Sequence, residues 1–184
     1  MKFFLTVFII FFSFQSWTKA DDIRDFEIEG ISIGDSILDF YNQKEINNAV
    51  DNSYDDTKFV TRTFFLNNSD IYEFIQLTFK PYGKKIIYGI NAGVIYDDNF
   101  DDCHNLKKDI SSELSSIFPT AKIKNWGRYE FSKGHYFPIT YDLNDSSRVM
   151  VACYKWDKEA NTSDSLKVTI FSNDYQIFLS KQDQ

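Results

Sequence analysis

The sequence predicts an α+β domain built on an antiparallel sheet, and three observations support this prediction. Several segments alternate apolar and polar residues with a period of two, as strands do. Short turns rich in Asn, Gly and Pro join them, and such turns suit antiparallel neighbours. Two other segments repeat apolar residues at helical spacing. We therefore expect an antiparallel sheet with two helices on one face, in an αβββ–αβββ arrangement.

The first half of the chain contains one of these helices. Asp35 or Ser36 is a good N-cap for it. Gly89 and Gly93 fall on the opposite face of their strand from its large apolar residues, where they leave room for a close neighbour. The predicted elements are a short strand at 26–29, a helix from 36 to about 50, and strands at 57–66, 71–79 and 84–96.

The second half begins with the clearest helix, at 101–118. Its start carries Asp101 and Asp102, which favour the positive end of the helix dipole, and Pro119 stops it. Strands follow near 121–131, 136–143, 148–156 and 165–172, with a short apolar piece at 175–179. The residues of the helix that form one apolar stripe are Cys103, Leu106, Ile110, Leu114 and Ile117.

Residues 1–20 have the pattern of a cleavable secretory signal. Lys2 gives a positive start, an apolar run extends to Phe14, and small residues precede a cut before Asp21. The run is shorter than the roughly 20 apolar residues of a membrane span. We expect residues 21–184 to form a single exported domain, periplasmic or extracellular, with no stable membrane anchor after cleavage.

Cys103 and Cys153 are the only cysteines. An even number of cysteines in an oxidising compartment usually pairs, so we predict one disulfide between them. Cys103 lies on the apolar stripe of the second helix, and Cys153 shares a strand face with Val149 and Val151. A loop of this length is worth about 4 kcal/mol in the chain-entropy model. The alternative is two buried free thiols.

The formal net charge of −7 argues against nucleic acid as a partner, because nucleic-acid binding requires a basic surface. Metal ligands are also sparse. Asp97, Asn99 and Asp101 alternate as in a calcium loop, but Asp102 and Lys108 stand where such a loop requires Gly and Glu. An acidic helix cap is the favoured interpretation. Neither histidine has spaced partners for zinc, so we predict no metal site and no cofactor.

The sequence GISIG at 30–34 matches the G-x-S-x-G pattern of a hydrolase nucleophile. That chemistry needs an established parallel sheet, and an acid and a histidine placed to form a triad. Only one short strand precedes Ser32, and nothing around His104 or His135 indicates a triad. A helix-entry turn is the favoured interpretation. The alternative is a small serine hydrolase that pairs Ser32 with His135 or His104.

The longer segment GISIGDSILDF, within residues 28–50, resembles the opening of small exported bacterial proteins of unknown function with an α+β build. More distantly it is similar to the start of BamE-like outer-membrane assembly proteins and of the related β-lactamase-inhibitor fold. Those proteins place a Gly, a hydrophobe and a small polar residue before a helix that packs on an antiparallel sheet. The resemblance implies the same packing here. The lipid-anchor cysteine of the BamE pattern is missing.

Residues 121–141 are the one region where the composition becomes basic and aromatic. Aromatic rings beside cations can form a surface for a sugar, a peptide or an anionic group. The alternative is a half-buried strand whose rings pack inward while Lys and Arg face water. The predicted ligand-binding residues are Trp126, Arg128, Tyr129, Lys133, His135 and Tyr136.

These observations together favour an exported, non-enzymatic binding or interaction domain whose partner is an unknown small molecule or protein. The serine hydrolase remains one alternative. An envelope-assembly or inhibitor-type protein partner, which would work through a flat or concave sheet surface, is the other.

Overall fold

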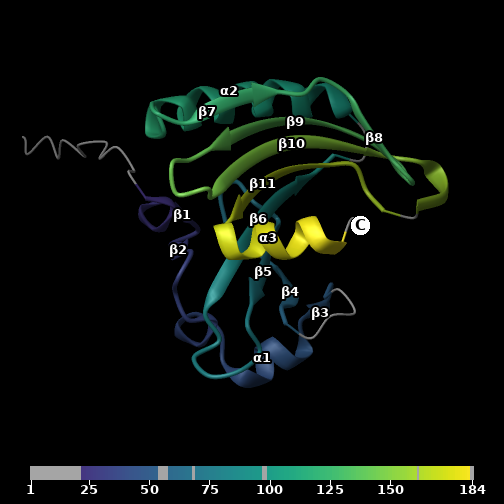
Figure 1. Cartoon of the computed structure of the whole chain (residues 1–184). Coiled ribbons are helices and arrows are strands. Elements are labelled where there is room, and N and C mark those ends of the chain that lie inside the picture. Colours follow the sequence, from purple (N-terminus) through teal and green to yellow (C-terminus); the bar gives the residue numbers. More distant parts are fainter. Residues whose placement is uncertain (1–21, 54–57, 68, 97–98, 161, 183–184) are drawn as a thin grey trace, which may run out of the picture.

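The computed structural model describes residues 22–53, 58–67, 69–96, 99–160 and 162–182 (Figure 1). The expected signal sequence at 1–20 lies outside them. The described strands are β1 (Glu27–Ile28), β2 (Ile31–Ser32), β3 (Val50–Asp51), β4 (Val60–Phe65), β5 (Phe74–Phe79), β6 (Ile87–Ile95), β7 (Lys122–Asn125), β8 (Tyr129–Phe131), β9 (Gly134–Asp142), β10 (Arg148–Trp156) and β11 (Ser165–Phe171). The described helices are α1 (Gln43–Asn48), α2 (Phe100–Ile117) and α3 (Asn173–Gln182), with short 3-10 helices at Ile23–Asp25, Ile37–Asp39 and Lys158–Ala160.

The described strand pairs are all antiparallel, which confirms the predicted α+β class with an antiparallel sheet. Strands β1 and β2 form a separate hairpin. The main sheet of the described chain has nine strands in the order β3-β4-β5-β6-β11-β10-β9-β7, with β8 also paired to β9. Strands β4 to β6 form one meander and β9 to β11 a second. Their last strands, β6 and β11, pair at the centre.

Helix α2 packs on one face of this sheet, mainly against β10. Cys103 and Leu114 are fully buried, and Leu106, Ile110 and Ile117 pack against the same core, as the helical spacing predicts. Asp101 and Asp102 lie in the first turn. The central strands supply the other side of this core through Ile75, Leu77, Ile90, Ala92, Val149, Val151, Val168 and Ile170. We call this side of the sheet the α2 face.

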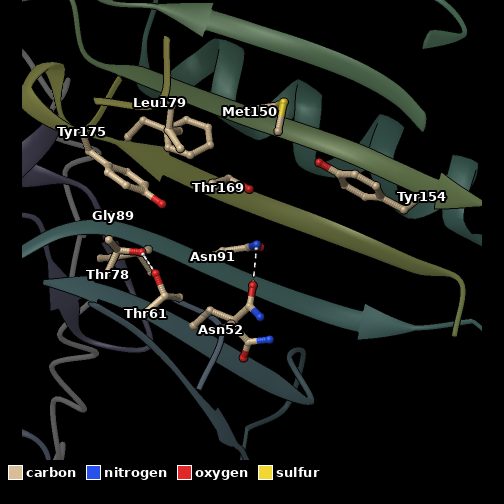
Figure 2. A pocket seen from close by; sticks show the side chains of 13 residues that line it. Asn52, Thr61, Thr78, Gly89, Asn91, Met150, Tyr154, Thr169, Tyr175 and Leu179 are labelled. Atoms are coloured by element: carbon tan, nitrogen blue, oxygen red, sulfur yellow. Dashed lines mark hydrogen bonds between the residues drawn. The ribbon is translucent and has the colours of Figure 1, made fainter. Parts of the chain in front are cut away.

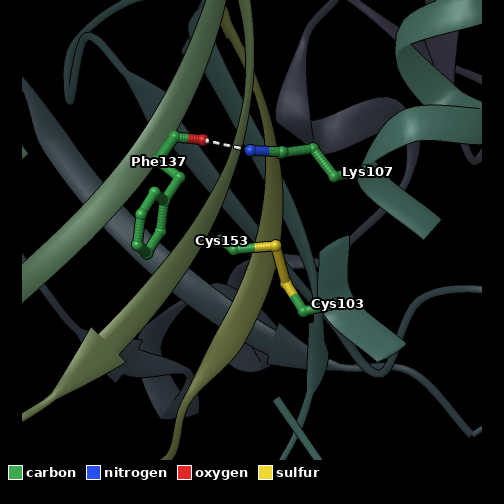
Figure 3. The surroundings of a disulfide bond; sticks show 4 residues. All are labelled: Cys103, Lys107, Phe137 and Cys153. Carbon is green, nitrogen blue, oxygen red and sulfur yellow. Dashed lines mark hydrogen bonds between the residues drawn. A yellow bond between two sulfur atoms is a disulfide. The ribbon is translucent and has the colours of Figure 1, made fainter. Parts of the chain in front are cut away.

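The predicted disulfide joins α2 to β10. Cys103 and Cys153 are bonded, with their Cα atoms 6.0 Å apart, and both side chains are fully buried. Figure 3 shows a second link beside the bond, where Lys107 on α2 donates from Nζ to the Phe137 carbonyl of β9 at 3.0 Å. Burial lowers the pKa of Lys107. The helix is therefore fastened to two neighbouring strands.

Three local features differ from the expected elements. The helix expected from 36 to about 50 is split, because Asn42 starts α1 with its own capping box to Glu45. The 3-10 turn before it is capped by Ser36, as expected. The strand expected at 121–131 is broken into β7 and β8 at Gly127, which has a φ of +66°. The apolar piece at 175–179 belongs to α3, a helix of the second face.

Candidate functional site

Helix α3 lies across the face of the sheet that is turned away from α2, and the sheet curves around it (Figure 1). We call this side the α3 face. Tyr175 and Phe178 of α3 are buried with Phe59 in a small apolar cluster separate from the main core. A Cβ at Gly89 would lie 2.9 Å from the Tyr175 ring. At Gly93 it would lie 2.2 Å from the Phe74 ring, so both glycines admit close neighbours, as predicted.

A row of polar side chains crosses the α3 face. The strand register places Thr63, Gln76, Asn91 and Thr169 opposite one another on β4, β5, β6 and β11. Asn91 Nδ2 donates to Gln76 Oε1 at 2.9 Å, and Gln76 Nε2 donates to Thr63 Oγ1 at 3.0 Å. Thr63 Oγ1 donates in turn to Asn52 Oδ1 at 2.5 Å. The side chains thus form one directional hydrogen-bond chain.

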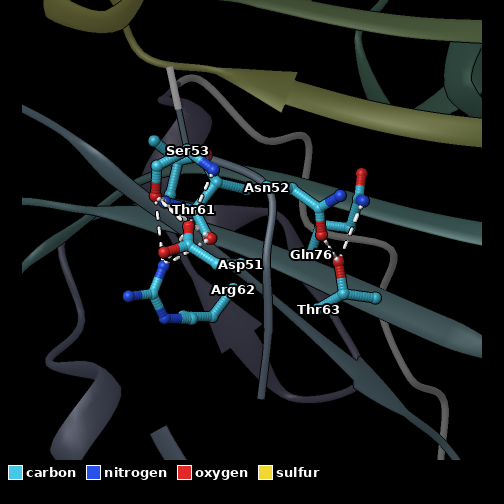
Figure 4. Close-up of polar contacts among 8 residues, drawn as sticks. Asp51, Asn52, Ser53, Thr61, Arg62, Thr63 and Gln76 are labelled. Carbon is cyan, nitrogen blue, oxygen red and sulfur yellow. Dashed lines mark hydrogen bonds and ion pairs between the residues drawn. The ribbon is translucent and has the colours of Figure 1, made fainter. Parts of the chain in front are cut away.

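The outer end of this chain is fixed at the β3–β4 edge (Figure 4). Asp51 pairs with Arg62 at 2.5 Å and accepts from the Ser53 hydroxyl at 2.6 Å. Arg62 also donates to the Thr61 carbonyl at 3.1 Å. The Ser53 hydrogen bonds, and more weakly Arg62, hold the pKa of Asp51 below its ordinary value. These contacts set the position of Asn52, which lies between Asp51 and Ser53.

The inner end of this hydrogen-bond chain, at Asn91, carries an unpaired polar atom. Asn91 Oδ1 is buried and has no hydrogen-bond partner in the part of the chain that the structure describes. Reversing every amide in the chain would put the Asn91 NH₂ at the same place, so either direction leaves one unpaired polar atom there. Such a buried group costs about 1–3 kcal/mol. A native fold that keeps it at mid-sheet has a reason to do so.

Asn91, the residue that carries this buried atom, lines a cavity of about 220 Å³ between α3 and the sheet. Gln76, Thr78 and Thr169 contribute to its polar lining, and Met150, Phe171 and Leu179 to its apolar lining. Figure 2 shows Tyr154 and Tyr175 at opposite ends of the cavity, each with its hydroxyl directed inward. Among the described residues that line the cavity, none carries a charge. The arrangement offers hydroxyl and amide groups between two aromatic rings.

The structure divides the residues predicted from 121–141 between the two faces. Tyr136 lies on the α3 face and stacks on Tyr154 with ring centroids 5.0 Å apart. Tyr129, 51% exposed, contacts Tyr136 edge-on at 5.4 Å. Trp126, 41% exposed, donates from Nε1 to Thr140 Oγ1 at 3.1 Å. These three extend the α3 face from the cavity towards the β7–β8 edge.

The other three predicted residues do not join them. His135 lies next to Tyr136 in β9 and therefore points to the opposite face, where its ring is 5.5 Å from Phe137. Arg128 is exposed and pairs with Glu130 at 2.6 Å. Lys133 is exposed in the turn between β8 and β9. The structure thus gathers Trp126, Tyr129 and Tyr136 on one face and turns His135 to the other.

Ser32 and the two histidines, which the serine-hydrolase alternative would pair, contact different residues. Ser32 lies in the β1–β2 hairpin, is 7% exposed, and donates from Oγ to the Phe26 carbonyl at 3.3 Å. His104 packs edge-on between Phe100 and Phe137, and burial lowers its pKa. In the described chain, neither histidine hydrogen-bonds to Ser32.

The described residues hold no group of three or more His, Cys, Asp or Glu side chains arranged for a metal ion. Asp97 of the calcium-like pattern lies outside them. No described helix combines the length and apolar character needed to cross a membrane.

Comparison of the chain with protein-family models, with curated proteins and with solved structures gave no match. Nothing in that comparison bears on the resemblance of residues 28–50 to exported or BamE-like proteins. The site must therefore be interpreted from its own geometry.

Sequence reasoning missed the centre of the site. Asn91, Gln76 and Thr169 are polar residues in central strands, and their period-two positions share a face with Gly89 and Gly93. That shared face was the available signal. Their meeting at one row depends on β6 pairing with β11, which the sequence pattern alone does not reveal.

Proposed function

We propose that the protein is an exported, non-enzymatic binding domain that holds a small hydroxyl-rich ligand between α3 and the sheet. The observation that carries the proposal is that Asn91, whose buried Oδ1 is unpaired, lines the cavity. A ligand hydroxyl placed there would donate to Asn91 and complete the hydrogen-bond chain that runs to β3. This would recover the cost of the buried group on binding.

The size and lining of the cavity support a ligand of the monosaccharide class. The cavity volume of 220 Å³ corresponds to about seven water molecules. It is smaller than the pockets that hold drug-sized ligands. Hydroxyl groups both donate and accept, so they match a wall of amides, threonines and tyrosines. Tyr154 and Tyr175 add aromatic surface at the two ends. Export is supported by the disulfide and by the signal pattern.

Binding without catalysis fits the chemistry of the cavity lining. Its polar groups are amides and hydroxyls, and none of these side-chain types is ionised near neutral pH in its ordinary state. General acid–base catalysis needs a group poised to exchange a proton near the working pH.

The proposal is tested by isothermal titration of the oxidised protein with glucose, galactose and mannose. We expect at least one hexose to bind at one site. Asn91→Leu, which removes the polar atoms, should weaken that binding up to about tenfold. The matched control is Asn105→Leu on the exposed side of α2, which should bind as the wild type does. Circular dichroism checks that both variants are folded.

Two results would contradict the proposal. One is that none of the three hexoses binds. The other is that a hexose binds Asn91→Leu as tightly as the wild type, which would place the ligand elsewhere on the protein.

A further inference from the structure

Lys167 lies on the α3 face beside the cavity. It precedes Thr169 by two residues on β11, so both side chains point to the same face, about 7 Å apart along the strand. Its Nζ atom is 5.0 Å from the centre of the Tyr154 ring and 5.9 Å from that of Phe74. Tyr154 lines the cavity, so the ammonium group of Lys167 lies against a residue of the cavity wall.

The charge of Lys167 is not balanced by a carboxylate in the described part of the chain. The half-buried cations Arg62, Arg148 and Lys155 each pair with an aspartate, and half-buried Lys107 donates to a backbone carbonyl. Lys167 is also half-buried, but among the described residues it has neither kind of partner. This is notable in a chain with 27 acidic residues. The two rings stabilise the cation through their π faces but leave its N–H groups without an anionic acceptor.

Burial lowers the pKa of Lys167 by disfavouring its charged form, as it does for Lys107. A half-buried ammonium group is normally retained where a counter-charge reaches it. Lys167 lies near the cavity to which Asn91, with its unpaired oxygen, contributes. A ligand bound in that cavity could therefore supply the missing negative charge.

Building on the proposed function, we propose that the ligand is a uronic acid whose ring hydroxyls meet Asn91 and whose carboxylate pairs with Lys167. The two contacts lie along one direction of the face, from the polar row towards Tyr154. The same chemistry is available from a free uronic acid and from an acidic glycan that presents a uronate at its end.

The test compares galacturonate with galactose and with the methyl ester of galacturonate. The three share one sugar ring, but only galacturonate carries a charge. A new charge-assisted hydrogen bond should make galacturonate bind about tenfold to a hundredfold more tightly than the other two. Titration calorimetry at physiological salt measures all three affinities.

Lys167→Met removes the charge and keeps most of the side-chain volume, so it should abolish the preference and leave galactose binding unchanged. The matched control is Lys124→Met on β7. That ammonium group also lies over a ring, 3.1 Å from the centre of Trp126, but it is three strands away in the sheet. Lys124→Met should keep the full preference for galacturonate.

The outcomes separate the two proposals. Equal binding of galactose and galacturonate, both dependent on Asn91, would overturn the uronate proposal and leave the hexose site intact. A preference that survives in Lys167→Met would also overturn it. Binding of none of the sugars would remove the proposed function itself. Galacturonate binding that requires Lys167 but not Asn91 would place the sugar ring away from Asn91 and contradict the uronate proposal.

Tetragalacturonate distinguishes the two sources of the uronate. Binding at least as tight as that of the monomer, and dependent on Lys167, supports the end of a glycan chain. Binding of the monomer alone supports a free acid, because the rest of a chain would then collide with the walls of the site.

Discussion

The two faces of the main sheet differ in how completely their side chains are packed and hydrogen-bonded. On the α2 face, apolar side chains are fully buried against one helix and a disulfide closes the layer. On the α3 face, a shorter helix covers only part of a polar row and leaves a cavity with an unpaired amide oxygen. Alternation along each strand lets the same backbone serve both purposes. Apolar burial and the disulfide are concentrated on one face, and the proposed binding site lies on the other.

Strand β6 shows this division within a few residues. Ile90 and Ala92 are buried in the main core. Gly89, Asn91 and Gly93 point the other way, towards Tyr175, the cavity and Phe74. A one-residue slip of this strand would exchange the two sets and destroy both faces.

A large effect is expected from the disulfide of the α2 face. Replacing Cys103 and Cys153 together by Ser should lower the free energy of unfolding by about 4 kcal/mol, because the unfolded chain gains entropy. Urea unfolding followed by circular dichroism measures the change. A loss below about 1 kcal/mol would show that the bond contributes little to the α2 face.

A pair of neighbouring residues on β11 compares the two faces directly. Ile170→Ala on the α2 face should cost about 2–5 kcal/mol, since it leaves a void among fully buried side chains. Thr169→Ala on the α3 face borders an existing cavity and should cost no more than about 1.5 kcal/mol. Urea unfolding of the two variants side by side gives the contrast. Equal costs would contradict the division of roles.

The packing of α3 on the sheet is tested at Gly89. A methyl group there meets the Tyr175 ring at 2.9 Å and Thr78 Cβ at 3.2 Å, so Gly89→Ala should push α3 outward at a cost of about 1–3 kcal/mol. Amide hydrogen exchange should become faster in α3 and remain unchanged in α2. Equal acceleration in both helices would mean that the two faces are not independent.

The smallest expected effect is a pH dependence at Lys167. Burial lowers its pKa in the folded state below the ordinary 10.5. Between the lowered value and 10.5 the unfolded chain binds more protons, so the stability of the wild type should rise with pH relative to Lys167→Met. Urea unfolding of both proteins from neutral to alkaline pH measures the difference. A difference that stays constant with pH would show that Lys167 is not desolvated.

Much of the fold follows from sequence periodicity. The helical stripe through Cys103 and Leu114 predicts α2 and its buried side, and the predicted partner of the disulfide lies beneath it. The strand pattern also places Gly89 and Gly93 on a face with close neighbours. Each of these features depends either on residues that are near in sequence or on the single pair of cysteines.

The site is less predictable because it depends on distant pairing. Asn91 meets Thr169 only because β6 and β11 are neighbours at the centre of the sheet. The predicted group around Trp126 is divided between the two faces for a simpler reason. His135 and Tyr136 are adjacent in one strand, and adjacent residues of a strand point to opposite faces. Applying the period-two rule within 121–141 would have separated them.

The central claim, that the cavity of the α3 face binds its ligand through Asn91, is tested most directly by nuclear magnetic resonance. Galacturonate is titrated into ¹⁵N-labelled protein while the side-chain amide signals of Asn91 and Gln76 are followed. The account predicts a saturable shift of both signals, with Asn105 on α2 unchanged as the internal control. Saturable binding detected in the same sample with no shift at Asn91 or Gln76 would contradict it.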